Sequence, residues 1–405
     1  MSDLPDNLGE PAWMIAATTR ATMAALEAAG GEGCARYVGG CVRNTLTGHP
    51  VDDIDIATIL TPEAVIEAAK AAGLKAVPTG VEHGTVTVVA SGKPFEVTTL
   101  RRDVSTDGRR AVVAFTDDWN EDAQRRDFRF NALYADGTGR IFDPTGAGVA
   151  DAVARRVVFV GDAITRIRED YLRILRYFRF LAWYGEGELD PEAVVACASE
   201  RDMLADRPGE RISKELLKLL AAPDPRRAMR LMAEAGVLQV VMPFPIQLAR
   251  FETMVDIDSD PELRLAALLP DEDAETALAV AERLRLSNAQ RDRLIAAAGA
   301  RLYSMGAAEA RRLIYRLGPR TFSDKARLAW AATGVVDSVE WKAIAGAPEG
   351  WVVPSFPITG ADALAAGLPK GPKLGQALRA IEDGWVAGDF AEGREALLAR
   401  LRGLA

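Results

Sequence analysis

The chain has 405 residues, of which 49% are hydrophobic and 26% charged, and its formal net charge is −9. This length and apolar content suffice for two or three domains with packed cores. No window approaches the ~18 uninterrupted apolar residues of a membrane span, and the acidic N-terminus lacks the basic region of a signal peptide. We therefore expect a cytoplasmic protein that does not contact a membrane.

The charge pattern limits where nucleic acid can bind. A net negative chain excludes a phosphate-binding coat over the whole molecule, because phosphate contacts need Lys and Arg. Arg nevertheless outnumbers Asp and Glu between residues 101 and 180, so any RNA contact is expected along that segment and at a few later basic patches. The three cysteines have no metal-binding spacing and fit a reducing compartment. Only two histidines exist, so a histidine general base is not expected.

The first predicted elements are a helix over residues 11–30 and a strand, turn, helix, turn and strand over residues 37–58. Gly39 and Gly40 end the first strand and open the short helix. Free backbone N–H groups and the positive end of a helix favour an anion there, and Arg43 in the first turn adds a charge. This stretch therefore predicts a phosphate-binding turn.

Two carboxylates follow the turn. Asp53 and Asp55 alternate with isoleucines, which predicts a strand with both carboxylates on one face. Facing carboxylates repel each other unless a cation lies between them, and an oxygen-only ligand set suits Mg²⁺ bound together with substrate phosphates. Taken singly, each motif is better explained without a function, the glycines as an ordinary turn and the aspartates as solvated residues of an edge strand.

The two motifs in this order, GGxVR and then DxD, resemble the nucleotidyltransferase site of the polymerase beta superfamily. The form is that of class II tRNA nucleotidyltransferases and bacterial poly(A) polymerases, with Asn44 where the family motif ends in Asp. The resemblance implies an α+β fold: a head with a polymerase beta-like antiparallel sheet and helices over residues 20–150. An all-α neck with a base-selecting helix over 151–222 and a helical body and tail binding tRNA over 223–405 would follow.

Further elements of the head follow residue 60. Thr61 and Pro62 predict the start of a helix that runs to residue 72. Runs rich in β-formers near 74–78, 84–90 and 94–100 predict an antiparallel meander. Glu96 lies in the last of these runs, and the resemblance implies that it is a third acidic ligand, although a solvent-facing strand residue explains it almost as well.

A polar segment over residues 103–112 resembles the mobile loop of those family members that add A, with Arg109 and Arg110 as its contact residues. RRDFRFNAL, residues 125–133, then resembles the family motif RRDFTxNA and departs from it at Arg129. The guanidinium groups of Arg125 and Arg126 suit a triphosphate. Asp127 is expected to hold one of those arginines or a ribose hydroxyl.

REDYLRILRYFRF, residues 168–180, resembles the family motif EDxLRxxRxxRF. On a single helix, Glu169 and Asp170 lie one turn from Arg173, and Arg176 continues the row. Cytosine and adenine each present an amino donor beside a ring-nitrogen acceptor, so a carboxylate paired with a guanidinium would choose C and A over G and U. From spacing alone, a surface ion pair worth ~0.3–0.5 kcal/mol explains the same residues.

Three later segments also resemble family elements. Residues 141–151 resemble DPxxGxxDL and are expected to act as structural support and a hinge. Residues 208–220 resemble the ERxxxE element, in which Glu210, Arg211 and Glu215 would form a buried ion network. Residues 357–378 resemble a C-terminal GxDL...GPxxG segment, whose Lys370 and Lys373 would approach RNA or simply lie in a loop between helices.

The resemblance as a whole implies template-independent addition of C, C and A to the 3′ end of tRNA from CTP and ATP, with Mg²⁺ and release of pyrophosphate. No protein partner is predicted. A poly(A) polymerase or an enzyme that adds only the terminal A is the alternative within the family, and EDYLR favours the CCA enzyme. An inactive RNA-binding homologue would have no use for a metal pair. A nucleotidyltransferase for small molecules would not need about 250 residues of trailing helices.

Overall fold

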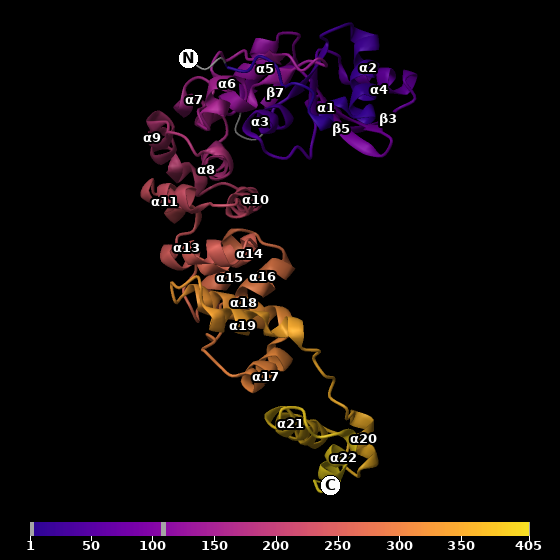
Figure 1. Cartoon of the computed structure of the whole chain (residues 1–405), viewed down its shortest axis with the longest axis vertical. Helices are drawn as coiled ribbons and strands as arrows, with labels where there is room; N and C mark the ends of the chain where they lie inside the picture. Colours follow the sequence, from indigo (N-terminus) through magenta and orange to yellow (C-terminus); the bar gives the residue numbers. More distant parts are fainter. Residues whose placement is uncertain (1–3, 107–110, 405) are drawn as a thin grey trace. The chain divides into compact units, whose positions relative to one another are not determined.

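The computed structural model describes residues 4–106 and 111–404 (Figure 1). The chain divides into two compact units, Met1–Pro243 and Phe244–Ala405. The first unit contains the predicted head and neck and the first residues of the predicted body, and the finer division into head, neck and body stays a prediction. Within the described residues, no helix combines the length and the apolar character needed to cross a bilayer.

A seven-stranded sheet in the first unit has the strand order β3-β4-β5-β2-β1-β8-β9. Strands β3, β4 and β5 form the predicted antiparallel meander, whereas β2 and β5 run parallel. The sheet is therefore mixed, because the connection through α4 (Pro62–Ala71) precedes the meander, which returns β5 beside β2. The strands are β1 (Ala35–Val38), β2 (Asp55–Thr58), β3 (Lys75–Gly80), β4 (Thr85–Ala90), β5 (Lys93–Thr99), β8 (Tyr134–Ala135) and β9 (Ile141–Phe142).

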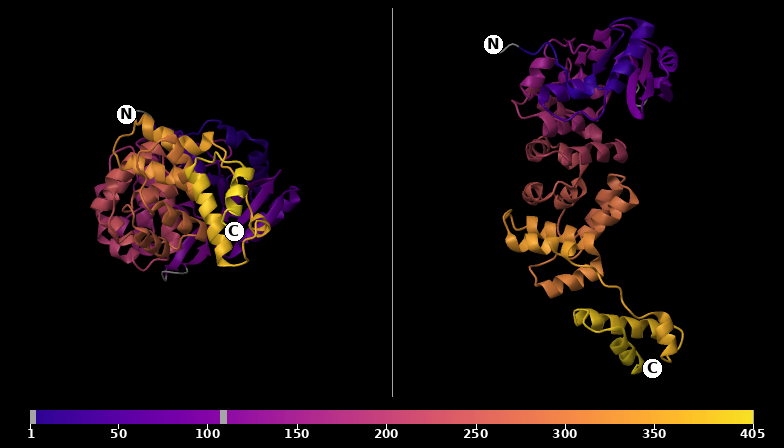
Figure 2. Two further views of the ribbon diagram at one scale, coloured as in Figure 1. Left: turned by 90° about the horizontal axis from the view of Figure 1, so that it is seen from below. Right: turned by 45° about the vertical axis from the view of Figure 1, so that its right-hand side comes forward.

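Two helices cover one face of this sheet. Helix α2 (Ala17–Gly30), preceded by the short α1 (Ala12–Ile15), packs beside α4 (Pro62–Ala71), and both contact β4 (Figures 1 and 2). As predicted, the Thr61 side chain caps α4 by accepting from the backbone N–H of Ala64. Strand alternation directs Val86 and Val97, which are fully buried, to the same face of the sheet. The opposite face is left for polar side chains.

Strand β2 begins at Asp55, so Asp53 lies just before the strand and not within it, which corrects the predicted strand start. Asp55 lies in register with Glu96 of β5. Side chains in register on neighbouring strands point to the same face, so this pair shares the polar face. The expectation that Glu96 stands on a strand beside the DxD carboxylates is confirmed.

The segment predicted as a polar loop is mostly a hairpin. Strands β6 (Arg101–Thr106) and β7 (Ala111–Phe115) pair antiparallel in a separate two-stranded sheet. β-branched residues on both strands favour this pairing over a loop. The predicted contact residues Arg109 and Arg110 lie outside the described residues.

Helices make up the rest of the first unit. The segment 168–180 is not the single helix that was predicted: α7 ends at Glu169, Asp170 is extended, and α8 begins at Arg173. The helices are α3 (Gly40–Thr47), α5 (Trp119–Gln124), α6 (Gly148–Val153), α7 (Ala163–Glu169), α8 (Arg173–Tyr184), α9 (Pro191–Ser199), α10 (Gly209–Leu220), α11 (Arg226–Glu234) and α12 (Val237–Val241), with short 3₁₀ turns at Val81–His83, Arg129–Asn131 and Arg201–Leu204.

In the second unit, the described residues form helices and turns without strands, as predicted (Figure 2). One apolar cluster is centred on Ile314, Phe322 and Trp341, and another on Ile381, Trp385 and Leu397. The helices are α13 (Leu248–Ile257), α14 (Pro261–Ala267), α15 (Ala274–Arg283), α16 (Asn288–Ala297), α17 (Ala307–Leu317), α18 (Pro319–Ala331), α19 (Val339–Gly346), α20 (Gly360–Ala365), α21 (Pro372–Ala387) and α22 (Arg394–Arg402), with a 3₁₀ turn at Ala347–Gly350.

Candidate active site

A strongly basic pocket of about 530 Å³ lies in the first unit, where the segment after α5 meets α8 and α10. It brings together residues that are far apart in the sequence, including the predicted pairs Arg125 with Arg126 and Asp170 with Arg173. Eight basic and three acidic side chains surround it, so its field favours an anion. The lining residues are Arg125, Arg126, Asp127, Asp170, Leu172, Arg173, Arg176, Arg179, Arg211, Lys214, Glu215 and Lys218.

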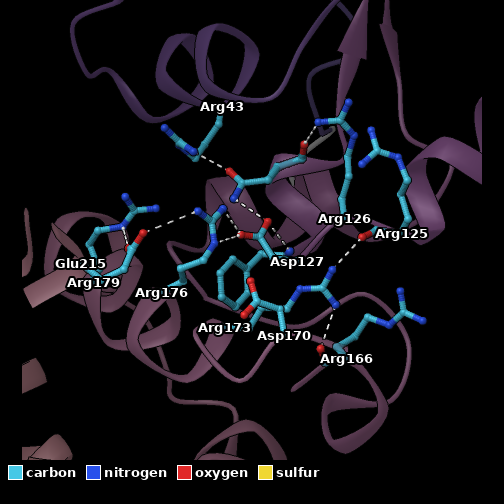
Figure 3. Close-up of polar contacts among 12 residues, drawn as sticks. Arg43, Arg125, Arg126, Asp127, Arg166, Asp170, Arg173, Arg176, Arg179 and Glu215 are labelled. Carbon is cyan, nitrogen blue, oxygen red and sulfur yellow. Dashed lines mark hydrogen bonds and ion pairs between the residues drawn. The ribbon is translucent and has the colours of Figure 1, made fainter. Parts of the chain in front are cut away.

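Asp127 is the buried centre of this pocket wall (Figure 3). It accepts hydrogen bonds from the backbone N–H of Phe128 at 2.9 Å, from the Asn131 amide at 3.0 Å and from Arg176 Nε at 2.8 Å. Burial alone would raise the pKa of Asp127, but Arg176 and the Asn131 amide outweigh it and lower the pKa to about 2. Asp127 thus holds an arginine, as expected, but that arginine comes from α8 and not from the neighbouring Arg125 or Arg126.

Arg173, at the start of α8, is held from two sides. It pairs with the Glu169 carboxylate at 2.5 Å. It also donates to the backbone carbonyls of Arg166 at 2.8 Å and Arg125 at 3.0 Å (Figure 3). In the described part of the chain these contacts leave its Nε–H for a ligand. The pocket lining includes Arg173 but, among the described residues, not Glu169. Glu169 thus holds Arg173 through its carboxylate, and its place in the nucleotide-binding site stays a prediction.

Asp170 lies in the short break between α7 and α8. Its carboxylate accepts from the Leu172 N–H at 3.1 Å and from Arg211 Nη2 at 2.9 Å. The side chain remains about 35% exposed, so an oxygen lone pair is accessible from the pocket. The break in the helix is what turns this carboxylate toward the pocket beside Arg173, and the sequence pattern gave no sign of it.

Helix α10 lines the pocket with Arg211, Lys214, Glu215 and Lys218. Arg179 Nε pairs with Glu215 at 3.2 Å (Figure 3). Arg211 pairs directly with Asp170. Arg211 is half exposed, however, and Glu210 is exposed at the start of the helix. The predicted buried network of this segment is therefore only partly right, since Glu215 alone of the three is well shielded.

The glycine turn lies beside the arginine pair. Gly39 has φ +66°, a conformation that favours glycine, and a Cβ atom there would lie 3.7 Å from Arg126 Nη1. Gly40 begins α3. Arg43, by contrast, is buried, and its guanidinium donates to Asn44, Asn131 and Tyr184. The expectation that Arg43 offers free charge to a phosphate is therefore corrected, because most of its N–H groups are already used.

Within residues 4–106 and 111–404, no ion pair is formed by the carboxylates of Asp55 and Glu96 on the polar face of the sheet. Burial raises the pKa of Asp55 to about 6, the Glu96 carboxylate adds to the rise and Arg126 opposes it, with Asp53 a smaller cause in the raising direction. A cation bound beside Asp55 would oppose this rise, because a nearby opposite charge favours the ionised carboxylate. Among the described residues no group of three or more His, Cys, Asp or Glu side chains is arranged to hold a metal. The oxygen donors of Asp53 and Asp55 still fit Mg²⁺, which commonly takes one or two carboxylates and completes its shell with phosphates and water.

Sequence reasoning missed two members of the site. Asp122, buried at 1% exposure, pairs with Arg125 and Arg126 at 2.8 and 2.9 Å. Its spacing of three and four residues before the two arginines on a predicted helical segment was the available signal. Tyr184 at the end of α8 had no such signal, because it reaches Arg43 across 141 residues of sequence.

The site therefore combines a basic pocket for a polyanion, a carboxylate and a guanidinium that reach the same cavity, and a set of unneutralised carboxylates near Arg126. A nucleoside triphosphate with a divalent cation matches these features: its phosphates suit the arginines, and its base suits Asp170 and Arg173.

Comparisons with known proteins agree with this chemistry. Residues 35–158 match the family described as Poly A polymerase head domain, and residues 188–247 match the one described as Probable RNA and SrmB- binding site of polymerase A. The chain is 33% identical over 381 residues to CCA tRNA nucleotidyltransferase 1, mitochondrial, of Mus musculus, covering 91% of this chain and 86% of that protein.

Bacterial relatives are similar as well. The CCA-adding enzyme of Geobacillus stearothermophilus is 41% identical over 206 residues, or 50% of this chain and 49% of that protein. The crystal structure of the Bacillus stearothermophilus CCA-adding enzyme in complex with CTP superposes with a TM-score of 0.78 at 29% identity, covering 96% of this chain and 98% of that one.

The pair of Asp127 and Arg176 generates a prediction about stability. The pKa of Asp127 is lowered from 3.8 to about 2, so its contribution is fully present above pH 4 and is lost as the pH falls toward 2. Replacing Asp127 with Asn removes the nearer charge partner of Arg176 and leaves only the Glu215 carboxylate at 4.0 Å. We expect the first unit to lose about 3 kcal/mol at pH 7, with the difference from wild type shrinking below pH 4. Urea unfolding across this pH range measures it.

The matched control is Asp202→Asn, which removes a carboxylate that is 81% exposed and should change stability by less than about 0.5 kcal/mol at every pH. A loss in Asp127→Asn that stays the same from pH 7 down to pH 2.5 would contradict the assignment.

Proposed function

The chain belongs to the class II family of CCA tRNA nucleotidyltransferases and poly(A) polymerases, and we propose that it adds C, C and A to the 3′ end of tRNA from CTP and ATP. It is a nucleotidyltransferase, as its relatives are. In each cycle, the 3′ hydroxyl of the RNA attacks the α-phosphorus of the nucleotide. A new phosphodiester bond forms, the bond to the bridging oxygen breaks, and pyrophosphate leaves.

One observation carries the proposal: a single pocket is lined by Arg125 and Arg126 from one segment and by Asp170 and Arg173 from another. The arginine pair provides donors for the triphosphate. The half-exposed Asp170 carboxylate and Arg173 guanidinium provide an acceptor and a donor for the base. Asp170 also pairs with Arg211 at 2.9 Å, and the proposal assigns its remaining oxygen lone pairs to the base.

Base choice follows from this donor and acceptor pair. Cytosine and adenine each carry an amino group beside a ring nitrogen, so an Asp acceptor and an Arg donor complement both. Uracil and guanine present the reverse pattern and would leave the Asp170 and Arg173 groups without a complementary partner on the base, which discriminates against them. The protein itself would thus select C and A without a template.

The head residues would serve the transfer. Asp53 and Asp55 would hold Mg²⁺, with Glu96 beside them, and the bound ion would offset charge on the phosphates and the attacking oxygen. The backbone N–H groups at Gly39 and Gly40 would contact phosphate oxygens at the start of α3. Arg125 and Arg126 would orient the triphosphate in line for attack.

The same family also contains enzymes with a different product. A poly(A) polymerase or an enzyme that adds only A is the second candidate, because the matched head family is described by poly(A) polymerase, whereas the relatives named above are CCA enzymes.

A cytoplasmic location stays a prediction, and the mouse relative is named as mitochondrial. The role of the hairpin β6–β7 in adding A also stays a prediction.

The test is to incubate the protein with Mg²⁺ and tRNA lacking CCA, with each nucleoside triphosphate alone and then with CTP and ATP together. We expect two additions with CTP alone and three with both nucleotides, resolved at single-nucleotide length. Long A tracts with ATP alone would favour a poly(A) polymerase. No incorporation under any condition would reject both the CCA-adding and the poly(A) polymerase activity.

Asp53→Asn and Asp55→Asn are each expected to lower nucleotide transfer by at least 10³-fold, because the carboxylates hold the ion that stabilises the displacement. Affinity for tRNA should change less than about threefold. Single-turnover incorporation and filter binding measure the two effects. Asp52→Asn, an exposed neighbour, is the matched control and should keep the wild-type rate. Near wild-type transfer by either site variant would remove the metal assignment.

Arg173→Ala is expected to reduce discrimination of CTP and ATP against UTP and GTP by at least tenfold, while the affinity for triphosphate falls less, because the lost group reads the base. Competition among the four nucleotides in one reaction measures this. Arg168→Ala removes an arginine of α7 that is 62% exposed and pairs with Glu200, and it should leave selection unchanged. Equal discrimination by Arg173→Ala and wild type would assign Arg173 to a structural ion pair.

A further inference from the structure

Asp122 on α5 is the most completely bonded carboxylate near the pocket, and it was not singled out by any family motif. Its Oδ1 accepts from Arg125 Nε at 2.9 Å, and its Oδ2 accepts from Arg126 Nη2 at 2.9 Å and from the Tyr134 hydroxyl at 2.7 Å. The side chain is 1% exposed. One carboxylate thus holds both arginines of the pair, one on each oxygen.

The carboxylate is itself fixed in place. The backbone N–H of Arg101 donates to Oδ1 at 3.3 Å, from the start of β6. Trp119 of the same helix packs edge-on against the Tyr134 ring at 5.2 Å between centroids. The Arg36 guanidinium stacks on Trp119 at 4.1 Å. Because α5 is anchored through Trp119 and Tyr134, the position of Asp122 is set by the core of the sheet.

Asp122 does not reach the ligand. Among the described residues that line the pocket are Arg125 and Arg126 but not Asp122. Its contacts use Nε and Nη2 of both arginines, so the Nη1 group of each guanidinium lies on the side away from the carboxylate. Arg126 Nη1 donates to the Asn131 carbonyl at 3.5 Å. Any effect of Asp122 on the ligand must therefore pass through the two arginines.

We propose that Asp122 is the positioning residue for the triphosphate: it holds the Arg125 and Arg126 guanidinium groups side by side, with their free N–H edges toward the phosphates. The proposal rests on the proposed function, because it assumes that the pair binds a nucleoside triphosphate. Two neighbouring guanidinium groups repel each other, and a buried carboxylate between them removes this repulsion and fixes their planes.

Charge and orientation predict opposite results when Asp122 is neutralised. Removing a negative charge near a polyanion would by itself tighten binding. Losing the carboxylate also lets the arginines separate and rotate, which weakens a contact that depends on geometry. Our proposal requires the loss of orientation to outweigh the gain from charge. The direction of the change in triphosphate affinity in Asp122→Asn therefore tests it.

The experiment measures binding of CTP and of inorganic tripolyphosphate to the full chain by calorimetry in Mg²⁺. Asp122→Asn is expected to weaken both ligands about tenfold and to leave the preference for CTP over UTP unchanged, since the base-reading residues are untouched. Tyr134→Phe keeps the charge and removes one donor to Asp122, and it should weaken both ligands about two- to threefold. Unchanged or tighter tripolyphosphate binding in Asp122→Asn overturns the proposal.

A matched control separates positioning from general destabilisation. Asp324→Asn removes another buried carboxylate that holds an arginine, Arg293, at 2.8 Å in the second unit. It should lower the unfolding temperature and leave tripolyphosphate affinity unchanged. If Asp122→Asn does not fold, Tyr134→Phe decides, and wild-type affinity in that variant overturns the proposal. A wild-type chain that binds tripolyphosphate but adds no nucleotide to tRNA rejects the proposed function separately, because the affinities are measured without RNA.

Discussion

Repulsion among closely spaced guanidinium groups is the constraint on which the site depends. Six arginines and two lysines surround one pocket of about 530 Å³, an arrangement that would push itself apart in a medium of low dielectric. Each of these arginines pairs with a carboxylate in the described structure: Asp122 holds Arg125 and Arg126, Asp127 holds Arg176, Glu169 holds Arg173, Glu215 holds Arg179 and Asp170 holds Arg211. Such pairs add little net stability but fix geometry.

Helix α8 connects the parts of the site. Its first residue, Arg173, lines the pocket, and Arg176 one turn later binds Asp127 behind the arginine pair. Its last residue, Tyr184, accepts from Arg43 at 2.9 Å and donates to Asn44 at 3.1 Å on α3, the helix that begins at the glycine turn. A single helix thus connects the pocket at its first residue with the helix that follows the glycine turn at its last.

The arginines of the pocket and the carboxylates on the sheet occupy separate regions, and this separation matches the charges of a triphosphate with a bound cation. The carboxylates of Asp55 and Glu96 share one face of the sheet without an ion pair, while Arg126 is close enough to oppose the rise in the pKa of Asp55. A triphosphate that spans from the arginines toward these carboxylates needs a cation at one end and guanidinium groups at the other. A triphosphate with a bound cation would therefore complement both the arginines and the carboxylates of the site.

The sequence by itself determined the elements whose signals are local: the glycine turn, the capped helix at Thr61, the meander, the helical second half and the arginine and carboxylate motifs. These follow from backbone conformation and side-chain periodicity, which act over a few residues. Only the tertiary structure decided the parallel pairing of β2 with β5, the break at Asp170, the enclosure of Arg43 and the partner of each arginine. Those outcomes depend on residues up to 141 positions apart, and a charge pattern along the chain does not specify which carboxylate will be buried beside which guanidinium.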